Sequence, residues 1–160
     1  MVAGRTASSG PGLGAASRSI PTALPSRLVL FDGTCGLCDR SVQWMLEHDA
    51  EHVLRFAPLQ GETAKRLRQC WPEEFPEGLE SVVLVDSTGE ETAVLTRSRA
   101  VLAVLEALGA TPWRLRLLRL IPRPLLDLAY RGIARLRYRI FGQYDTCRMP
   151  SAEERDLFLT

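Results

Sequence analysis

Two cysteines three residues apart, Cys35 and Cys38, carry the strongest chemical signal in this sequence. They follow the apolar run 28–31, which predicts a short buried strand, and they open a segment of helical spacing, which predicts a helix over 36–48. Residues i and i+3 on a first helical turn are neighbours, so the two sulfurs can close a small disulfide ring without a large backbone movement. The spacing therefore favours reversible disulfide chemistry at the start of a helix.

The predicted position of the pair gives each thiol a role. A helix N-terminus presents unpaired N–H groups and a partial positive charge, which stabilise a thiolate at Cys35, the thiol we expect to be the more exposed. Cys35 then attacks a substrate disulfide, and Cys38, one turn deeper, resolves the mixed disulfide by attacking Cys35. Protein or small-molecule thiols and disulfides are the expected partners, and the exchange requires no bound cofactor.

Asp32, at the C-terminal end of the predicted strand, is the third candidate catalytic residue. Proteins of the α/β class place their reactive groups at this end of a strand. The carboxylate could take the proton from Cys38 during resolution, or its charge could raise the pKa of a thiol and restrain Cys35 at rest. The structural alternative is an aspartate that only caps the turn or the helix.

Two other interpretations of the cysteine pair remain open. Two cysteines at this spacing form half of a tetrahedral zinc site, but no second pair with ligand spacing follows in the sequence, so no metal is expected. A pair of buried, inert thiols is the second alternative. Both interpretations remove the redox function and leave the predicted strand and helix unchanged.

The remaining two cysteines lie far from the pair along the chain. Cys147 follows the last predicted helix and is a candidate accessory redox thiol that relays oxidation from the pair. A loop cysteine packed into the domain is the alternative for Cys147. Cys70, at the end of a predicted helix, is expected to be a packed residue.

The elements that hold these residues alternate along the chain from residue 27. Apolar runs predict further strands over 53–57, 81–86 and 92–96, the last two joined as a hairpin. Helical spacing and capping signals predict helices over 62–70, 99–108 (capped by Ser98), 112–120 and 124–141. This order predicts an α/β fold in which helices flank a four-stranded mixed sheet, with extra C-terminal helices.

The sequence resembles the DCC family of predicted thiol-disulfide oxidoreductases, named for the Asp-x-x-Cys-x-x-Cys pattern that Asp32, Cys35 and Cys38 reproduce. The resemblance covers about residues 27–152 and includes the runs 56–60, 112–114 and 130–150, the last with Cys147. It implies a thioredoxin-like fold and a disulfide exchange activity, without a named substrate.

The chain departs from the family's pattern in its C-terminal run. Leu136 stands where members often have Asn, and Ile140 where they often have an aromatic residue. Glu80 and Ser81 stand at the start of the third predicted strand, where thioredoxins carry a cis-proline that shapes the substrate groove.

Composition indicates one ordinary globular domain. The chain has 160 residues and a net charge of +1. Residues 1–26 are rich in Gly, Ala, Ser and Pro and contain no acid, which predicts a disordered tail, with an organelle transit peptide as the alternative. We place the domain at 27–152 and a C-terminal tail at 153–160. Sparse cysteines and the lack of a secretory signal in the tail predict a cytoplasmic protein.

Positive charge is concentrated in the C-terminal half. Eleven arginines and only three acidic residues lie between Arg97 and Arg148. Because apolar residues alternate with these arginines, residues 112–141 could lie on an anionic membrane surface or receive an acidic partner. The alternative is a packed helix pair whose arginines extend to solvent.

These charges give a second functional hypothesis, a non-enzymatic module that senses redox state or docks to a membrane or partner. The near-neutral total charge argues against a general nucleic-acid binder.

Overall fold

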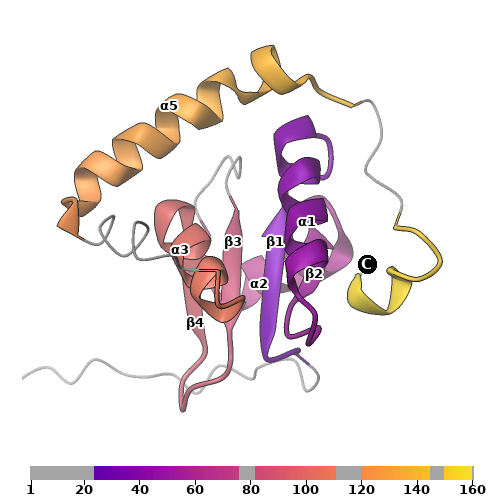
Figure 1. Ribbon diagram of the computed structural model, residues 1–160. Helices are drawn as coiled ribbons and strands as arrows, with labels where there is room; N and C mark the ends of the chain where they lie inside the picture. Colours follow the sequence, from indigo (N-terminus) through magenta and orange to yellow (C-terminus); the bar gives the residue numbers. More distant parts are fainter. Residues whose placement is uncertain (1–23, 76–81, 111–119, 145–149, 160) are drawn as a thin grey trace, which may run out of the picture.

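A mixed four-stranded sheet forms the centre of the protein in the computed structural model, which describes residues 24–75, 82–110, 120–144 and 150–159 (Figure 1). The strands are β1 (Arg27–Phe31), β2 (Arg55–Pro58), β3 (Val83–Asp86) and β4 (Ala93–Thr96), in the order β2-β1-β3-β4. Strand β1 pairs parallel with β2 and antiparallel with β3, and β3 pairs antiparallel with β4 as the predicted hairpin. The predicted mixed sheet is confirmed, and this arrangement is a thioredoxin-like fold.

Strand β1 is buried on both faces, which explains why its sequence is a continuous apolar run. Val29 and Phe31 point to one side of the sheet, and Leu28 and Leu30 point to the other. Each face of the sheet therefore needs its own covering layer of helices.

Helices cover the two faces unequally, as Figure 1 shows with α1 and α3 in front of the sheet and α2 behind it. Helix α1 (Gly36–His48) and helix α3 (Arg97–Ala107) pack against the side of Val29 and Phe31. Helix α2 (Glu62–Cys70) packs against the opposite side through Ala64 and Leu67. The dithiol motif therefore lies in the layer of α1 and α3.

Helix α5 (Arg123–Phe141) is the longest helix described, with 19 residues. It contacts α1 and α3 and runs along the outside of that layer in Figure 1. Pro124 sits in its first turn, where a missing N–H costs no helical hydrogen bond. Among the described residues, no helix is both long and apolar enough to cross a membrane.

The start of α3 differs from the predicted one. Ser98 was expected to cap a helix starting at residue 99, but α3 begins at Arg97, and Thr96 is the N-cap without a side-chain hydrogen bond. The hydroxyl of Ser98 instead donates to Asp127 of α5 at 2.7 Å. The prediction was wrong because a long-range partner satisfies this hydroxyl.

The last described residues pack against the sheet. The short 3-10 helix η2 (Arg155–Leu157) leads to Phe158, whose ring lies 5.5 Å from that of Phe56. The N–H of Leu159 donates to the Phe56 carbonyl at 2.8 Å. These residues belong to the segment 153–160 that we expected to be a tail. The helix predicted over 112–120 lies outside the described residues except at its final residue.

Candidate functional site

Cys35 and Cys38 lie together at the N-terminal end of α1, as predicted. Cys35 is the N-cap, and its sulfur accepts a hydrogen bond from the Cys38 N–H at 3.4 Å. Both thiols are free. Cys35 is fully buried and Cys38 is 6 % exposed. The expectation that Cys35 is the more exposed thiol is therefore wrong.

Cys35 belongs to the buried core cluster, and the far end of the chain pairs with the backbone around it. Residues 141–144, which we call the strap, start at the last residue of α5 and run antiparallel to the residues around Cys35. The Gly36 N–H donates to the Gly142 carbonyl at 3.3 Å, and the Tyr144 N–H donates to the Thr34 carbonyl at 2.8 Å. The strap thus occupies backbone groups on both sides of the predicted nucleophile.

Gly36 allows this close approach. A β-carbon at this position would collide with the Phe141 carbonyl oxygen and would lie 3.4 Å from the Gly142 oxygen. Only a residue without a side chain fits between α1 and the strap. The glycine between the two cysteines is therefore explained by packing.

Asp32 is buried and accepts hydrogen bonds on both carboxylate oxygens. One oxygen accepts from the Thr34 N–H at 3.0 Å, from the Thr34 hydroxyl at 2.8 Å and from Gln60 Nε2 at 3.0 Å. The other accepts from Arg137 Nη2 at 2.9 Å and from the Tyr138 hydroxyl. Capping of the turn explains the Thr34 bonds but not the donors from residues 28 or more positions away.

These donors decide the charge of the carboxyl group. Burial acts to raise the pKa of Asp32, but hydrogen bonds from Tyr138, Thr34 and Gln60 outweigh it and hold this pKa below its usual range. Burial and the Asp32 carboxylate in turn raise the pKa of Tyr138 to about 12. Asp32 is consequently an ionised acceptor, and Tyr138 is a neutral donor, at physiological pH.

The thiol of Cys38 is in the opposite situation. Burial, together with the hydrogen bond and charge of Cys35, raises the pKa of Cys38 to about 12, and Asp32 acts in the same direction. The guanidinium of Arg137 opposes this rise, since its Nη1 lies 3.9 Å from the Cys38 sulfur. Cys38 is therefore held as a neutral thiol while the site is at rest.

The sequence analysis missed Gln60, Arg137 and Tyr138 as site residues. All three lie in runs that resemble the DCC pattern, but Arg137 was grouped with the arginines of a basic surface. In the structure Arg137 is only 2 % exposed and forms a salt bridge with Asp32. A signal was present in the phase of α5, because Tyr130, Ala134, Arg137 and Phe141 recur at helical spacing on its packed side.

Cys70 is not brought into this site. Cys70 ends α2 and packs in the cluster on the opposite face of the sheet. Cys147 lies outside the described residues. Within the described ranges, no group of three or more His, Cys, Asp or Glu side chains is arranged to hold a metal ion.

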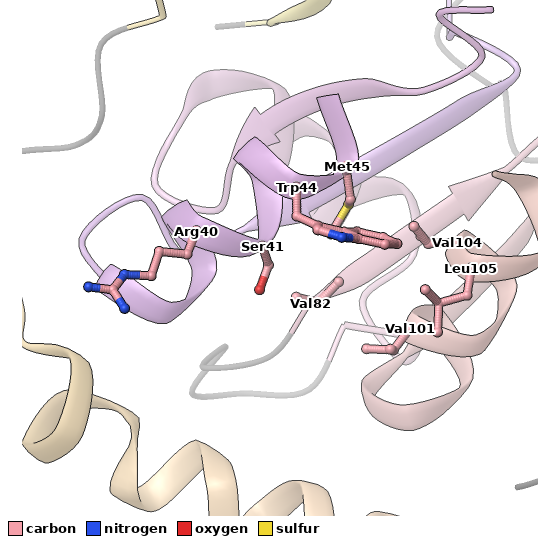
Figure 2. Close-up of a pocket in the computed structure, with 8 residues that line it drawn as sticks. All are labelled: Arg40, Ser41, Trp44, Met45, Val82, Val101, Val104 and Leu105. Carbon is pink, nitrogen blue, oxygen red and sulfur yellow. The ribbon is translucent and has the colours of Figure 1, made fainter. Parts of the chain in front are cut away.

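A groove of about 290 Å³ lies between α1 and α3, on the same side of the sheet as the dithiol. Most of its lining is apolar, and Figure 2 shows the Arg40 guanidinium at one end, directed away from the apolar side chains. From α1 it continues to Val82, the residue directly before β3. This surface has the size and chemistry to receive an apolar side chain. Its lining residues are Arg40, Ser41, Trp44, Met45, Val82, Val101, Val104 and Leu105.

Comparison with known proteins places the sequence in a family. The family description "DCC1-like thiol-disulfide oxidoreductase" matches residues 29–143. The uncharacterized protein YuxK of Bacillus subtilis (strain 168) is 35 % identical over 138 residues, which cover 85 % of this chain and 96 % of YuxK. The DCC family protein At1g52590, chloroplastic, of Arabidopsis thaliana is 32 % identical over 123 residues, 76 % of this chain and 69 % of that protein. No solved structure shows a significant match.

Proposed function

This chain belongs to the DCC1-like thiol-disulfide oxidoreductase family, and from this premise we propose that it is an enzyme that exchanges disulfides through Cys35 and Cys38. The observation that carries the proposal is the placement of two free thiols on the first turn of α1, with the Cys35 sulfur 3.4 Å from the Cys38 N–H. The substrates are thiols and disulfides of proteins or small molecules.

Cys35 is the attacking thiol in this proposal. Its sulfur lies at the N-terminus of α1 and accepts a hydrogen bond from the Cys38 N–H, and this hydrogen bond and the helix dipole both stabilise negative charge on the sulfur. Its thiolate attacks a substrate disulfide, forms a mixed disulfide and releases the first substrate thiol. Cys38 then attacks Cys35, releases the second substrate thiol and leaves an oxidised pair.

Access to Cys35 requires the strap to move. Cys35 is fully buried and its backbone pairs with the strap, so a substrate disulfide cannot approach the sulfur in this arrangement. Two backbone hydrogen bonds, donated by Gly36 and Tyr144, hold the strap to the residues around Cys35. Breaking two such bonds has a modest free-energy cost. We propose that opening of the strap precedes the attack.

Asp32 sets the charge of the site. Of the two roles that the sequence left open, general base for Cys38 is poorly supported, because its pKa is lowered and both of its oxygens already accept hydrogen bonds. Burial is the main cause that raises the pKa of Cys38, and the negative charge of Asp32 adds to it, so the resolving thiol stays protonated at rest. Asp32 thereby restrains the dithiol rather than driving it.

The redox equilibrium of the pair against glutathione tests this proposal. Thiol alkylation and mass spectrometry would follow wild type, Cys35→Ser, Cys38→Ser and Asp32→Asn over a range of glutathione ratios. We expect a reversible disulfide between Cys35 and Cys38 in wild type and in Asp32→Asn, at different glutathione ratios. Thiols that stay reduced at every ratio, or zinc that co-purifies with them, would overturn the proposal.

The outward side of α5 supports a second candidate function, docking on an anionic membrane surface. Five apolar side chains of α5 are 47–65 % exposed and recur every three to five residues, so they follow one side of the helix. Three exposed arginines follow a neighbouring row at a spacing of four. A helix with this pattern can lie in the interface of an anionic bilayer. The apolar residues are Leu125, Leu128, Ile133, Leu136 and Ile140, and the arginines are Arg131, Arg135 and Arg139.

Co-sedimentation with lipid vesicles tests the docking. We expect the full chain to bind vesicles that contain phosphatidylserine and to remain free of neutral phosphatidylcholine vesicles. Leu128→Glu should abolish binding, whereas Val101→Glu, at an exposed apolar residue of α3, should not. Equal binding by both variants, or no binding to anionic vesicles, would leave an acidic protein partner as the remaining docking hypothesis.

Location and the accessory thiol remain proposals. We propose a cytoplasmic protein, and the chloroplastic relative keeps organelle targeting by residues 1–26 as the alternative. Fusion of residues 1–26 to a fluorescent protein would separate the two. Relay of oxidation through Cys147 predicts a disulfide between Cys147 and the pair, which Cys147→Ser would remove without abolishing the Cys35–Cys38 bond.

A further inference from the structure

A single buried guanidinium joins the two groups that control the dithiol. Arg137 is only 2 % exposed, with Nη2 2.9 Å from the Asp32 carboxylate and Nη1 3.9 Å from the Cys38 sulfur. The Tyr138 hydroxyl accepts from Arg137 at 2.8 Å and donates to the same Asp32 oxygen. The arginine is thus fixed on one side and faces the resolving sulfur on the other.

Resolution of the mixed disulfide requires the thiolate of Cys38, which a positive charge close to its sulfur would stabilise. Cys38 must lose its proton to attack, but burial and the Asp32 carboxylate both disfavour its thiolate. The hydroxyl of Tyr130, also from α5, interacts with Cys38 electrostatically but carries no positive charge. The Arg137 guanidinium, with Nη1 3.9 Å from the sulfur, acts in the opposite direction and favours the thiolate.

We propose that Arg137 is a catalytic residue of the resolving step, which stabilises the Cys38 thiolate while Asp32 positions its guanidinium. The inference rests on the proposed disulfide exchange and adds a residue to it. The planar guanidinium can meet the carboxylate with one nitrogen and the sulfur with the other, which a lysine cannot do with the same geometry.

The resolving step starts from the mixed disulfide between Cys35 and the substrate. The Cys38 thiol gives its proton to solvent, and the thiolate attacks the Cys35 sulfur. The bond between Cys35 and the substrate sulfur breaks as the Cys35–Cys38 bond forms. The electron pair leaves on the substrate sulfur, which takes a proton from solvent. Over both steps the dithiol loses two electrons and the substrate disulfide gains them.

Reaction with dithiobis(nitrobenzoate) separates the two steps. In a Cys70→Ser, Cys147→Ser background, attack by Cys35 releases one coloured nitrothiobenzoate, and resolution by Cys38 releases a second. The rate of the second release, followed against pH, reports the ionisation of Cys38 in the mixed disulfide. The matched variants are Arg137→Met and, as the control, Arg135→Met at an exposed arginine of the same helix.

We expect Arg137→Met to slow the second release by about tenfold to a hundredfold near neutral pH, since hydrogen bonds to charged groups have this strength. Its pH midpoint should move upward, and the rate should recover in alkali. Arg137→Lys should recover part of the rate, and Arg135→Met should match the parent protein. A purely structural role would slow release at all pH values without moving the midpoint, and that result would overturn the inference.

Loss of Arg137 alone leaves the buried Asp32 carboxylate without its ionic partner and can destabilise the fold. The double variant Asp32→Asn, Arg137→Met removes both charges together and keeps the test available. It should fold and still show a slow second release with a higher midpoint than Asp32→Asn alone. An unchanged midpoint refutes the role of Arg137. Failure of the parent protein to release a second nitrothiobenzoate would instead refute the proposed exchange itself.

Discussion

Replacement of Gly36 by alanine tests whether the strap controls access to Cys35. The new β-carbon would lie closer than 3.0 Å to the Phe141 carbonyl oxygen, which belongs to backbone and cannot rotate away. Overpacking of this kind costs about 1–3 kcal/mol. Alanine in a helix returns less than about 1 kcal/mol. We therefore expect Gly36→Ala to lower the free energy of unfolding by about 1–2 kcal/mol. Displacement of the strap would remove the collision.

The displaced strap should expose the nucleophile. If opening of the strap limits the reaction, then destabilising its closed position by about 1–2 kcal/mol relative to the open one speeds alkylation of Cys35 by about 5- to 30-fold. Iodoacetamide labelling with peptide mass spectrometry measures this rate, and urea unfolding measures the stability of the same samples.

Two control variants make the result specific. Gly132→Ala, in α5, meets no atom within 4 Å and should stabilise the protein by about 0.5–1 kcal/mol without changing the labelling of Cys35. Val85→Ala loosens the core on the opposite face of the sheet and reports the effect of lower stability alone. Labelling of Cys35 that is no faster in Gly36→Ala than in Val85→Ala would refute control of access by the strap.

Three further predictions concern buried polar groups. The lowered pKa of Asp32 means that its carboxylate stabilises the fold above the unfolded value of 3.8 and that this stability is lost as the pH falls below it. The difference in free energy of unfolding between wild type and Asp32→Asn should accordingly be constant near neutral pH and shrink below about pH 4. Urea unfolding at a series of acid pH values measures this difference. A difference that does not change with pH would contradict the prediction. Cys38 has a pKa of about 12, so at pH 8 it should be alkylated about two to three orders of magnitude more slowly in the reduced, folded protein than in the unfolded chain. Peptide mass spectrometry measures both rates. Equal rates would contradict the burial of Cys38 as a neutral thiol. Asp49 is buried, and its carboxylate accepts hydrogen bonds from two backbone amides at 2.9 Å. Asp49→Ala should therefore lower the free energy of unfolding, measured in urea, by about 2–4 kcal/mol. A loss under about 0.5 kcal/mol would show that water takes the place of the carboxylate as acceptor.

The parts of the fold that depend on local sequence were predictable. Helix α1 spans Gly36–His48, the predicted bounds, because its apolar residues recur at helical spacing directly after a strand. Strand β1 was predicted within one residue from a run that is apolar on both faces. The order of elements then left a mixed four-stranded sheet as the economical arrangement.

The parts of the site that depend on distant residues were not predictable in the same way. The exposure of Cys35 was misjudged because the strap that covers it is more than 100 residues away along the chain. The role of Arg137 was missed because an arginine between apolar residues usually extends to solvent, and only the packing of α5 shows that this one is buried against Asp32. Ser98 was assigned to a cap for the same reason, since its partner lies on α5.

Trapping of the mixed disulfide tests the central claim most directly. Reduced Cys38→Ser and Cys35→Ser proteins, both with Cys70→Ser and Cys147→Ser, would be incubated with oxidised glutathione and mapped by peptide mass spectrometry. The exchange mechanism predicts a stable glutathione adduct on Cys35 in Cys38→Ser, no comparable adduct on Cys38 in Cys35→Ser, and an internal disulfide in the protein with both cysteines. An adduct that forms equally fast on Cys38, or none on Cys35, would contradict the assignment of Cys35 as nucleophile and Cys38 as resolving thiol.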